Sequence, residues 1–301
     1  MTGGALRRLR HNPIGMASLV VLGAIAAMSI AGPWVATAFG IHASAVDLFA
    51  RFGPPSIAHP LGSDELGRDL MVRLMLGGRV SLSIGFAAAV TTAVIGTLIG
   101  LLAGFRGGRI DAFAMRMTDG VIALPLLPLL IILAALDPSK LGLPDWISKS
   151  ESFSLYRITF IIALAGWPTT ARLVRATTLS LKQRDFIQAA VAAGFGPWRI
   201  MLRHILPNAA SPILVATTLT IGNVILLESA LSFLGLGIQP PIPSWGNMLT
   251  NAQELIHQAP ALALWPGMLI FVTVIAFNFL GDALQDALDP RSAAMKVPAP
   301  G

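Results

Sequence analysis

Glu228 is an acidic residue that lies well inside an apolar stretch, the run Ala209–Leu234. A charged side chain at the centre of a membrane helix costs about 2.5–3.5 kcal/mol on translocon scales. We therefore expect Glu228 to face the protein interior, to pair with a polar group, or to carry a proton. Two roles stay open: Glu228 lines a substrate pathway, with Asn223 and Asn278 as candidate partners, or it belongs to a structural hinge near Leu227–Gly237.

A second polar cluster mixes carboxylates with arginines: Asp64, Glu65, Arg68, Asp69, Arg73 and Arg79. Ser63 precedes it and is suited to cap a helix, because its hydroxyl can accept from the amides of the first turn. The pattern predicts a short helix over Ser63–Gly78 that lies on the external membrane surface. Such carboxylates can hold a hard cation, but the interleaved arginines favour salt bridges.

Other patterns argue against bond chemistry by the chain itself. The sequence has no cysteine, no G-x-x-x-x-G-K-[ST] phosphate loop, no H-E-x-x-H motif and no G-x-S-x-G elbow. Asp282, Asp286 and Asp289 suggest either a proton relay or solvated acids at a helix end, and their place after an apolar run favours the second. We expect no catalytic residue, metal or cofactor in this chain, so ATP and Mg would be bound by a partner.

The elements that must position these side chains are membrane helices. Of the 301 residues, 54% are hydrophobic and only 12% are charged, whereas soluble domains carry about 25% charged residues. Six apolar runs approach or exceed the ~20 residues that cross a bilayer as helix. They predict an all-α, polytopic membrane protein with spans at Met16–Phe39, Val80–Phe105, Thr118–Leu136, Ile158–Leu179, Ala209–Leu234 and Ala261–Ala283.

The distribution of basic residues predicts the orientation. If the N-terminus is cytoplasmic, 14 of the 21 Lys and Arg residues fall in cytoplasmic segments, as the positive-inside rule requires. Both termini are then cytoplasmic. The chain divides into a cytoplasmic segment 1–15, the first span 16–39, an external segment 40–79, a five-helix core 80–283 that includes a cytoplasmic segment 182–208, and a cytoplasmic tail 284–301.

The segment 182–208 between the fourth and fifth spans contains helix boundary signals. Asp185 is expected to cap a helix, and Gly194 to end it in the left-handed conformation. Pro197 suits the first turn of a second helix, which Pro207 is expected to stop.

The first of these two helices carries small and apolar side chains on one face: Phe186, Ala189, Ala190 and Ala193. Helical spacing leaves two interpretations open. The helix either packs against the chain's own spans or docks in the groove of a partner protein.

The pattern Gln188-Ala-Ala-x3-Gly194-x9-His204-Ile-Leu-Pro207 resembles the EAA loop of ABC-importer permeases, in the form typical of the dipeptide/oligopeptide group. Further blocks are similar to the C-type subunit of those importers: Leu61–Asp69, Gly166–Arg175, Leu227–Gly237 and Ala276–Asp282, continuing to Asp289–Arg291. The likeness runs from about Asn12 to Arg291. One difference is Gln188, where the family usually has Glu.

The resemblance implies a type I ABC importer permease in the bacterial inner membrane. Its partners would be a second, related permease in a heterodimer, two ATP-binding subunits and an external (periplasmic) substrate-binding protein. ATPase coupling would fall to Asp185, Phe186, Gln188, Ala189, Ala190, Gly194, Pro197, His204 and Pro207. Contact with the binding protein would fall to Asp64, Glu65, Arg68 and Asp69.

The implied substrates are short peptides, although relatives with these motifs also carry glutathione, antimicrobial peptides or nickel complexes. A different class also fits parts of the sequence. A self-sufficient, ion-coupled transporter would use Glu228 and the third span, which Pro125 and Pro128 interrupt, as its ion site.

Overall fold

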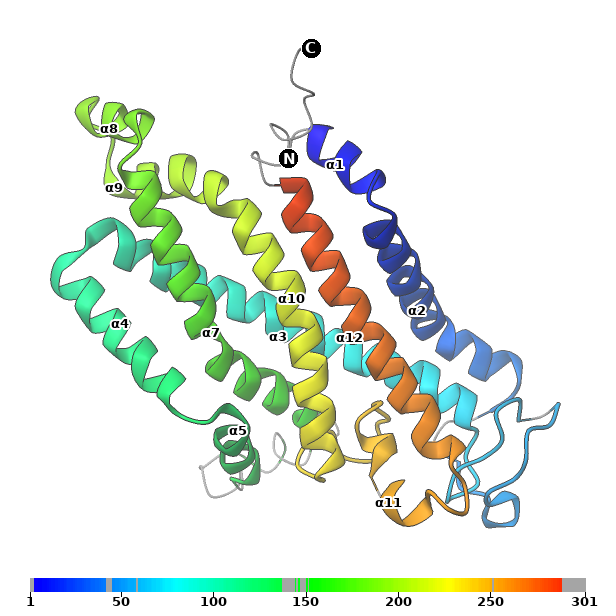
Figure 1. Ribbon diagram of the computed structural model, residues 1–301. Helices are drawn as coiled ribbons and strands as arrows, with labels where there is room; N and C mark the ends of the chain where they lie inside the picture. The colour runs from blue at the N-terminus through cyan, green and yellow to red at the C-terminus, as the bar shows by residue number, and fades with distance from the viewer. Residues whose placement is uncertain are drawn as a thin grey trace.

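The computed structural model describes residues 3–41, 45–57, 59–136, 144, 146, 150, 152–250 and 252–288. These residues form helices and loops (Figure 1), with one isolated bridge between Ser63 and Asp69. The helices are α1 (Gly3–Arg10), α2 (Pro13–Ala38), α3 (Leu70–Arg106), α4 (Gly108–Ala123), α5 (Leu126–Ala135), α7 (Phe153–Lys182), α8 (Asp185–Ala192), α9 (Pro197–Ile200), α10 (Leu206–Phe233), α11 (Ala252–Leu255) and α12 (Ala261–Leu288).

Length and apolar composition allow four helical stretches of the described chain to cross a membrane, namely α2, α3, the stretch Pro197–Phe233 and α12. The pair α4 and α5 makes a fifth if it counts as one span. The pair is bent by 86° at Pro125, one of the two prolines that were expected to interrupt the third span, whereas Pro128 lies within α5. The fourth expected span lies within α7. This helix has 30 residues and is long enough, but it is less apolar than the stretches that qualify as spans. Arg172 and Arg175 lie in its second half and lower its apolar character.

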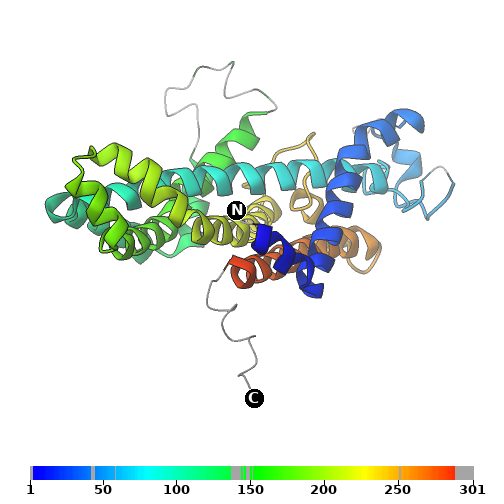
Figure 2. The same ribbon diagram turned by 90° about the horizontal axis from the view of Figure 1, so that it is seen from above.

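α3 is the central helix of the arrangement. It packs against α7, α10 and α2, and α10 packs in turn against α12 and α7. Figure 2 shows α3 running from the side that carries α7 and α8 to the side that carries α2 and α12. Figure 1 shows α1, α8, α9 and the end of α12 at one end of the molecule, here called the α8 end. The opposite end, here called the loop end, carries α11 and the segment Leu234–Thr250.

Three glycines set the close contact between α3 and α7. Gly96, Gly100 and Gly104 are four residues apart and therefore lie on one face of α3. A Cβ atom on Gly100 would lie 2.6 Å from the carbonyl oxygen of Ala171 and 2.8 Å from the Cβ of Val174. The two backbones thus approach to a distance that only glycine allows, which makes α3 and α7 one packed unit.

The external segment folds differently from the prediction. No helix begins at Ser63; α3 begins at Leu70, and its N-cap is Asp69, whose carboxylate accepts from the Val72 amide at 2.7 Å. Ser63 instead donates to the Ala50 carbonyl and accepts from the Gly53 amide. The predicted separate surface helix was therefore wrong, because residues 70–79 are the first turns of the long α3.

Candidate functional site

The α8 end carries a helix–turn–helix segment made of α8, the turn 193–196 and α9. Gly194 has a φ of +77° and ends α8 in the left-handed region, as predicted. Pro197 occupies the first turn of α9, also as predicted. Asp185 is not the cap: Arg184 holds that position, and Asp185 is the first helical residue, where its charge still suits the helix dipole.

Pro207 does not stop the second helix, contrary to the prediction. Met201–Ile205 forms one π-helical turn, and α10 follows without a break, with Pro207 in its first turn. The Leu206 amide donates to the Met201 carbonyl, five residues back. Proline has no amide to donate to the preceding turn, and Pro207 lies directly after the π turn, where the backbone pairing shifts from four residues back to five. The segment that carries α9 is thus continuous with α10.

α8 has one face that packs against the chain's own helices, as the first interpretation predicted, and one exposed face, for which docking to a partner stays a prediction. Ile187 and Ala190 are buried and pack with Ile200, Ile205 and Val174. On the other side Phe186, Ala189 and Val191 are exposed, and Trp198 of α9 is exposed by 55%. Large apolar side chains that face away from the fold are typical of a docking surface.

Side-chain contacts fix this segment to the ends of α3 and α7. Gln188 donates its amide Nε2 to the Lys182 carbonyl at 2.8 Å, a bond that the Glu of the EAA pattern could not make as a carboxylate. Lys182 in turn donates Nζ to the Phe105 carbonyl at 2.6 Å. His204 stacks on the ring of Phe195, with centroids 6.0 Å apart. The segment is therefore held in a defined position relative to both helices.

Arg172 and Arg175 connect α7 to α4. Arg172 pairs with Asp119, with Nη2 and Oδ1 2.5 Å apart. Arg175 forms a two-point pair with Asp111, in which Nη2 lies 2.6 Å from Oδ2. These pairs were not predicted, because Arg and Asp are more than 50 residues apart in sequence. They hold the bent pair of α4 and α5 beside the helix that leads into α8.

Glu228 is fully buried, with 0% exposure, and its partners differ from those predicted. Its carboxylate accepts from Ser232 Oγ at 2.7 Å and from Ser81 Oγ of α3 at 3.2 Å. Asn223 is exposed, and Asn278 donates Nδ2 to the Val274 carbonyl of its own helix at 2.8 Å. In this conformation Glu228 does not reach a surface along which a substrate could pass.

An open groove of about 450 Å³ lies between α7, α10 and α12, toward the α8 end. Its lining is mainly apolar and includes Pro212, Leu219 and Gln285. Asn223 follows Leu219 by one helical turn, and Asn278 precedes Gln285 by two turns, so both continue stripes that line the groove. The assignment of these two asparagines to a substrate pathway stays a prediction.

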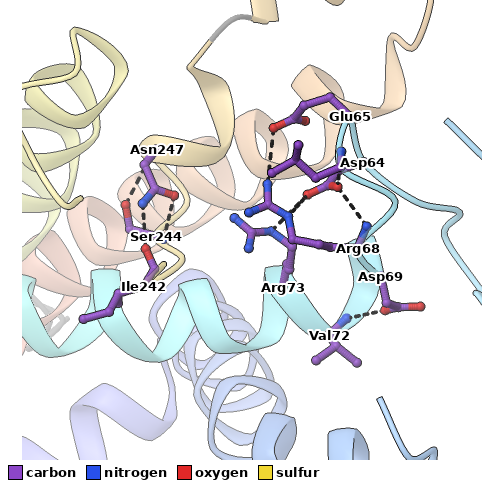
Figure 3. Close-up of polar contacts among 10 residues, drawn as sticks. Asp64, Glu65, Arg68, Asp69, Val72, Arg73, Ile242, Ser244 and Asn247 are labelled. Atoms are coloured by element: carbon purple, nitrogen blue, oxygen red, sulfur yellow. Dashed lines mark hydrogen bonds and ion pairs between the residues drawn. The ribbon is translucent and has the colours of Figure 1, made fainter. Parts of the chain in front are cut away.

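The predicted acidic cluster at the loop end is an internal ion-pair network (Figure 3). Asp64 is buried and accepts from the Arg68 guanidinium Nε at 2.7 Å, while its carboxylate lies 3.3 Å from Nε of Arg73. Asp69 is also buried and lies 3.0 Å from Nδ1 of His59. Asp64 and Asp69 therefore cannot supply the predicted contact with a binding protein in this conformation; Glu65 keeps about a third of its side chain exposed.

The described residues include no group of three His, Cys, Asp or Glu placed to hold a metal ion. Asp64, Glu65, Asp69 and Glu228 are paired or hydrogen-bonded within the fold, and the exposed candidate surface is the apolar face of α8 and α9. The arrangement suits mechanical contact between proteins at the α8 end. The described helices are those of a polytopic membrane protein, and sequence comparison identifies its family.

The chain belongs to the family described as binding-protein-dependent transport system inner membrane component, which matches residues 96–293. Residues 1–55 match the N-terminal transmembrane domain of oligopeptide transport permease C. The chain is thus a permease subunit of a multi-pass, inner-membrane type, and the family implies ATPase and substrate-binding partners.

Three relatives with similar sequences are named for peptide or glutathione transport. The dipeptide transport system permease protein DppC of Alkalihalophilus pseudofirmus is 37% identical, over 95% of this chain and 89% of its own length. The oligopeptide permease OppC of Bacillus subtilis is 36% identical over 95% and 88%. The glutathione permease GsiD of Pectobacterium atrosepticum is 42% identical over 79% and 74%.

A solved structure, the inward-facing MetNI methionine ABC transporter, has the same fold. It aligns with a TM-score of 0.57 over 73% of this chain and 98% of the matched chain, at 20% identity. The type I importer fold expected from the sequence is thereby confirmed.

Proposed function

We propose that this chain is the C-type permease subunit of an ATP-driven importer of short peptides. The observation that carries the proposal is the agreement of dipeptide and oligopeptide permeases with this sequence over 95% of its length. The family match and the fold agree with that assignment. In this role the chain forms one half of the passage and makes or breaks no bond. A second, related permease supplies the other half in a heterodimer.

The α8 end faces the cytoplasm in this proposal, and two partner ATPases bind ATP and Mg. The apolar face of α8 and α9, with Phe186 and Trp198 exposed, docks in a groove of one ATPase. Movement of the docked helices reaches α7 through the packed side chains of Ile187 and Ala190. It reaches α10 directly, because the helical stretch Pro197–Phe233 is continuous. The passage thereby opens alternately to the two sides.

The topology follows from the same assignment. α1 and the end of α12 lie at the α8 end (Figure 1), so both ends of the described chain are cytoplasmic when α8 is. Arg7, Arg8 and Arg10 of α1 support this orientation through the positive-inside rule. The loop end then faces the external binding protein, where Glu65 is the acid of the Asp64 network that remains exposed enough for contact.

The coupling surface can be tested by site-specific crosslinking, because the chain has no cysteine. Ala189→Cys lies on the exposed face of α8, and Leu164→Cys, on the membrane part of α7, is the matched control. We expect a thiol crosslinker to join the Ala189→Cys variant, but not the Leu164→Cys variant, to a nucleotide-hydrolysing subunit in native membranes. Failure to capture an ATPase from Ala189→Cys would refute the coupling assignment.

The substrate is tested on the binding protein that co-purifies with the complex. Mass spectrometry of the ligand retained by that protein should show short peptides. A retained glutathione or nickel complex would keep the importer assignment and change the substrate class.

A further inference from the structure

Glu228 has a place in the fold that substrate binding does not explain. Its carboxylate is completely buried, and the groups that donate to it include the hydroxyls of Ser81 and Ser232, together with that of Ser244. A buried carboxylate is costly unless hydrogen bonds compensate the lost hydration. The first two serines come from different helices, since Ser81 belongs to α3 and Ser232 to α10. Glu228 therefore joins α3 to α10 at the loop end.

The same two serines also hold the segment Leu234–Asn247, here called the external loop. Ser232 Oγ accepts from the Ile238 amide at 3.0 Å, and Ser81 Oγ accepts from the Trp245 amide at 3.2 Å. Each hydroxyl thus donates to Glu228 and accepts from the loop backbone. The carboxylate fixes the direction of both hydroxyl protons, which leaves the oxygen lone pairs free for the loop amides.

The loop is seated in the helices rather than lying over them. Trp245 is fully buried and donates its indole Nε1 to the Leu74 carbonyl of α3 at 2.9 Å. Gly78 leaves room for it, since a Cβ there would lie 2.7 Å from Cζ2 of the tryptophan ring. Within the loop, Asn247 donates Nδ2 to the Ile242 carbonyl at 2.8 Å and accepts from the Ser244 amide at 2.9 Å (Figure 3).

The loop shares a small cavity with the ion-pair network of Asp64. The lining of this cavity includes Glu65 and Arg68 from the network and Pro240 and Asn247 from the loop. The loop therefore forms part of the outer face at the loop end. The loop also follows α10 directly. Because α10 has 28 residues, about 42 Å of helix connects the α8 end to this loop.

We propose that Glu228 is a positioning residue that latches the external loop to α3 and α10. It acts through its serine partners, Ser81 and Ser232 on the helices and Ser244 in the loop, and touches no substrate. The latch makes the loop move with α10, so that a displacement at the α8 end is repeated at the outer face. This inference rests on the proposed function for its direction of coupling. It requires hydrogen bonding at position 228 and not a charge, because a side-chain amide can accept from one serine and donate to another.

Cysteine labelling tests the latch directly. Ile238→Cys is the reporter, because Ile238 is 2% exposed and its backbone amide is unaffected; the exposed neighbour Gln239→Cys is the control. With Glu228 in place, a membrane-impermeant maleimide should label Ile238→Cys at least tenfold more slowly than Gln239→Cys. Glu228→Ala should bring the two rates within about twofold, and Glu228→Gln should keep them apart.

Transport by the full complex gives the functional arm. We expect Glu228→Ala to reduce peptide uptake at least tenfold while ATPase co-purification stays unchanged, and Glu228→Gln to remain within about threefold of the original chain. Continued protection of Ile238→Cys from the maleimide in the Glu228→Ala variant would overturn the latch. Loss of uptake in the Glu228→Gln variant would also overturn it, because it would indicate that the charge itself is needed. An original complex that takes up no peptide would instead refute the proposed function, and the labelling result would still decide the latch.

Discussion

Substitution of Gly100 by alanine tests whether the α3–α7 contact stabilises this permease. The added methyl carbon would lie 2.6 Å from the Ala171 carbonyl oxygen, 2.8 Å from the Val174 Cβ and 2.9 Å from the Arg175 amide nitrogen. Two of these three atoms belong to the backbone of α7, so rotation of a side chain cannot relieve the clash. The two helices must move apart, and this separation weakens the neighbouring contacts between α3 and α7.

The size of the effect follows from two opposing terms. Overpacking of a well-packed interior costs about 1–3 kcal/mol, and a clash with backbone belongs at the upper end. Replacing glycine by alanine within a helix stabilises the helix by about 1 kcal/mol. Gly100→Ala should therefore lower the free energy of unfolding by about 2 kcal/mol. Gly23→Ala is the matched control: Gly23 lies in α2, and a Cβ there would have no neighbour within 4 Å.

The assay is reversible unfolding of the purified permease in mixed micelles of increasing SDS content, followed by circular dichroism. Because both variants exchange glycine for alanine in a long helix, the helix-propensity term largely cancels between them. The difference that remains, about 3 kcal/mol, measures overpacking between α3 and α7. Equal stability of Gly100→Ala and Gly23→Ala would refute the close packing of α3 on α7.

Three further variants test other parts of the structure. Asp69→Ala removes the N-cap of α3 and should lower the free energy of unfolding by about 1 kcal/mol in the same assay; no change would show that the cap is dispensable. Arg175→Gln breaks the two-point pair with Asp111 and should cost about 1 kcal/mol at low salt, with a smaller effect at high salt; a salt-independent loss would contradict an ionic contribution. Phe186→Ala combined with Trp198→Ala should weaken ATPase binding at least tenfold in a pull-down titration, and unchanged binding would exclude this face as the docking surface.

Sequence alone predicted the helical membrane fold, because membrane helices must satisfy their backbone hydrogen bonds within single apolar segments. The same local physics predicted the positive φ of Gly194 and the first-turn position of Pro197. It failed at Pro207 and Ser63, where the boundary depends on the neighbouring structure. A π-helical turn continues the chain into α10, and Asp69 takes the cap that Ser63 was expected to provide.

The partners of the polar side chains were decided only by the tertiary structure. The sequence marked Glu228 as a residue that must face the interior, since an apolar run cannot leave a carboxylate unpaired. It could not identify Ser81, which lies 147 residues away in the chain, nor place the Trp245 amide on the same hydroxyl. Hydrogen bonding across helices depends on which faces meet, and that is set by packing of the whole chain. Composition and periodicity therefore determined which groups needed partners, and helix packing determined which partners they have.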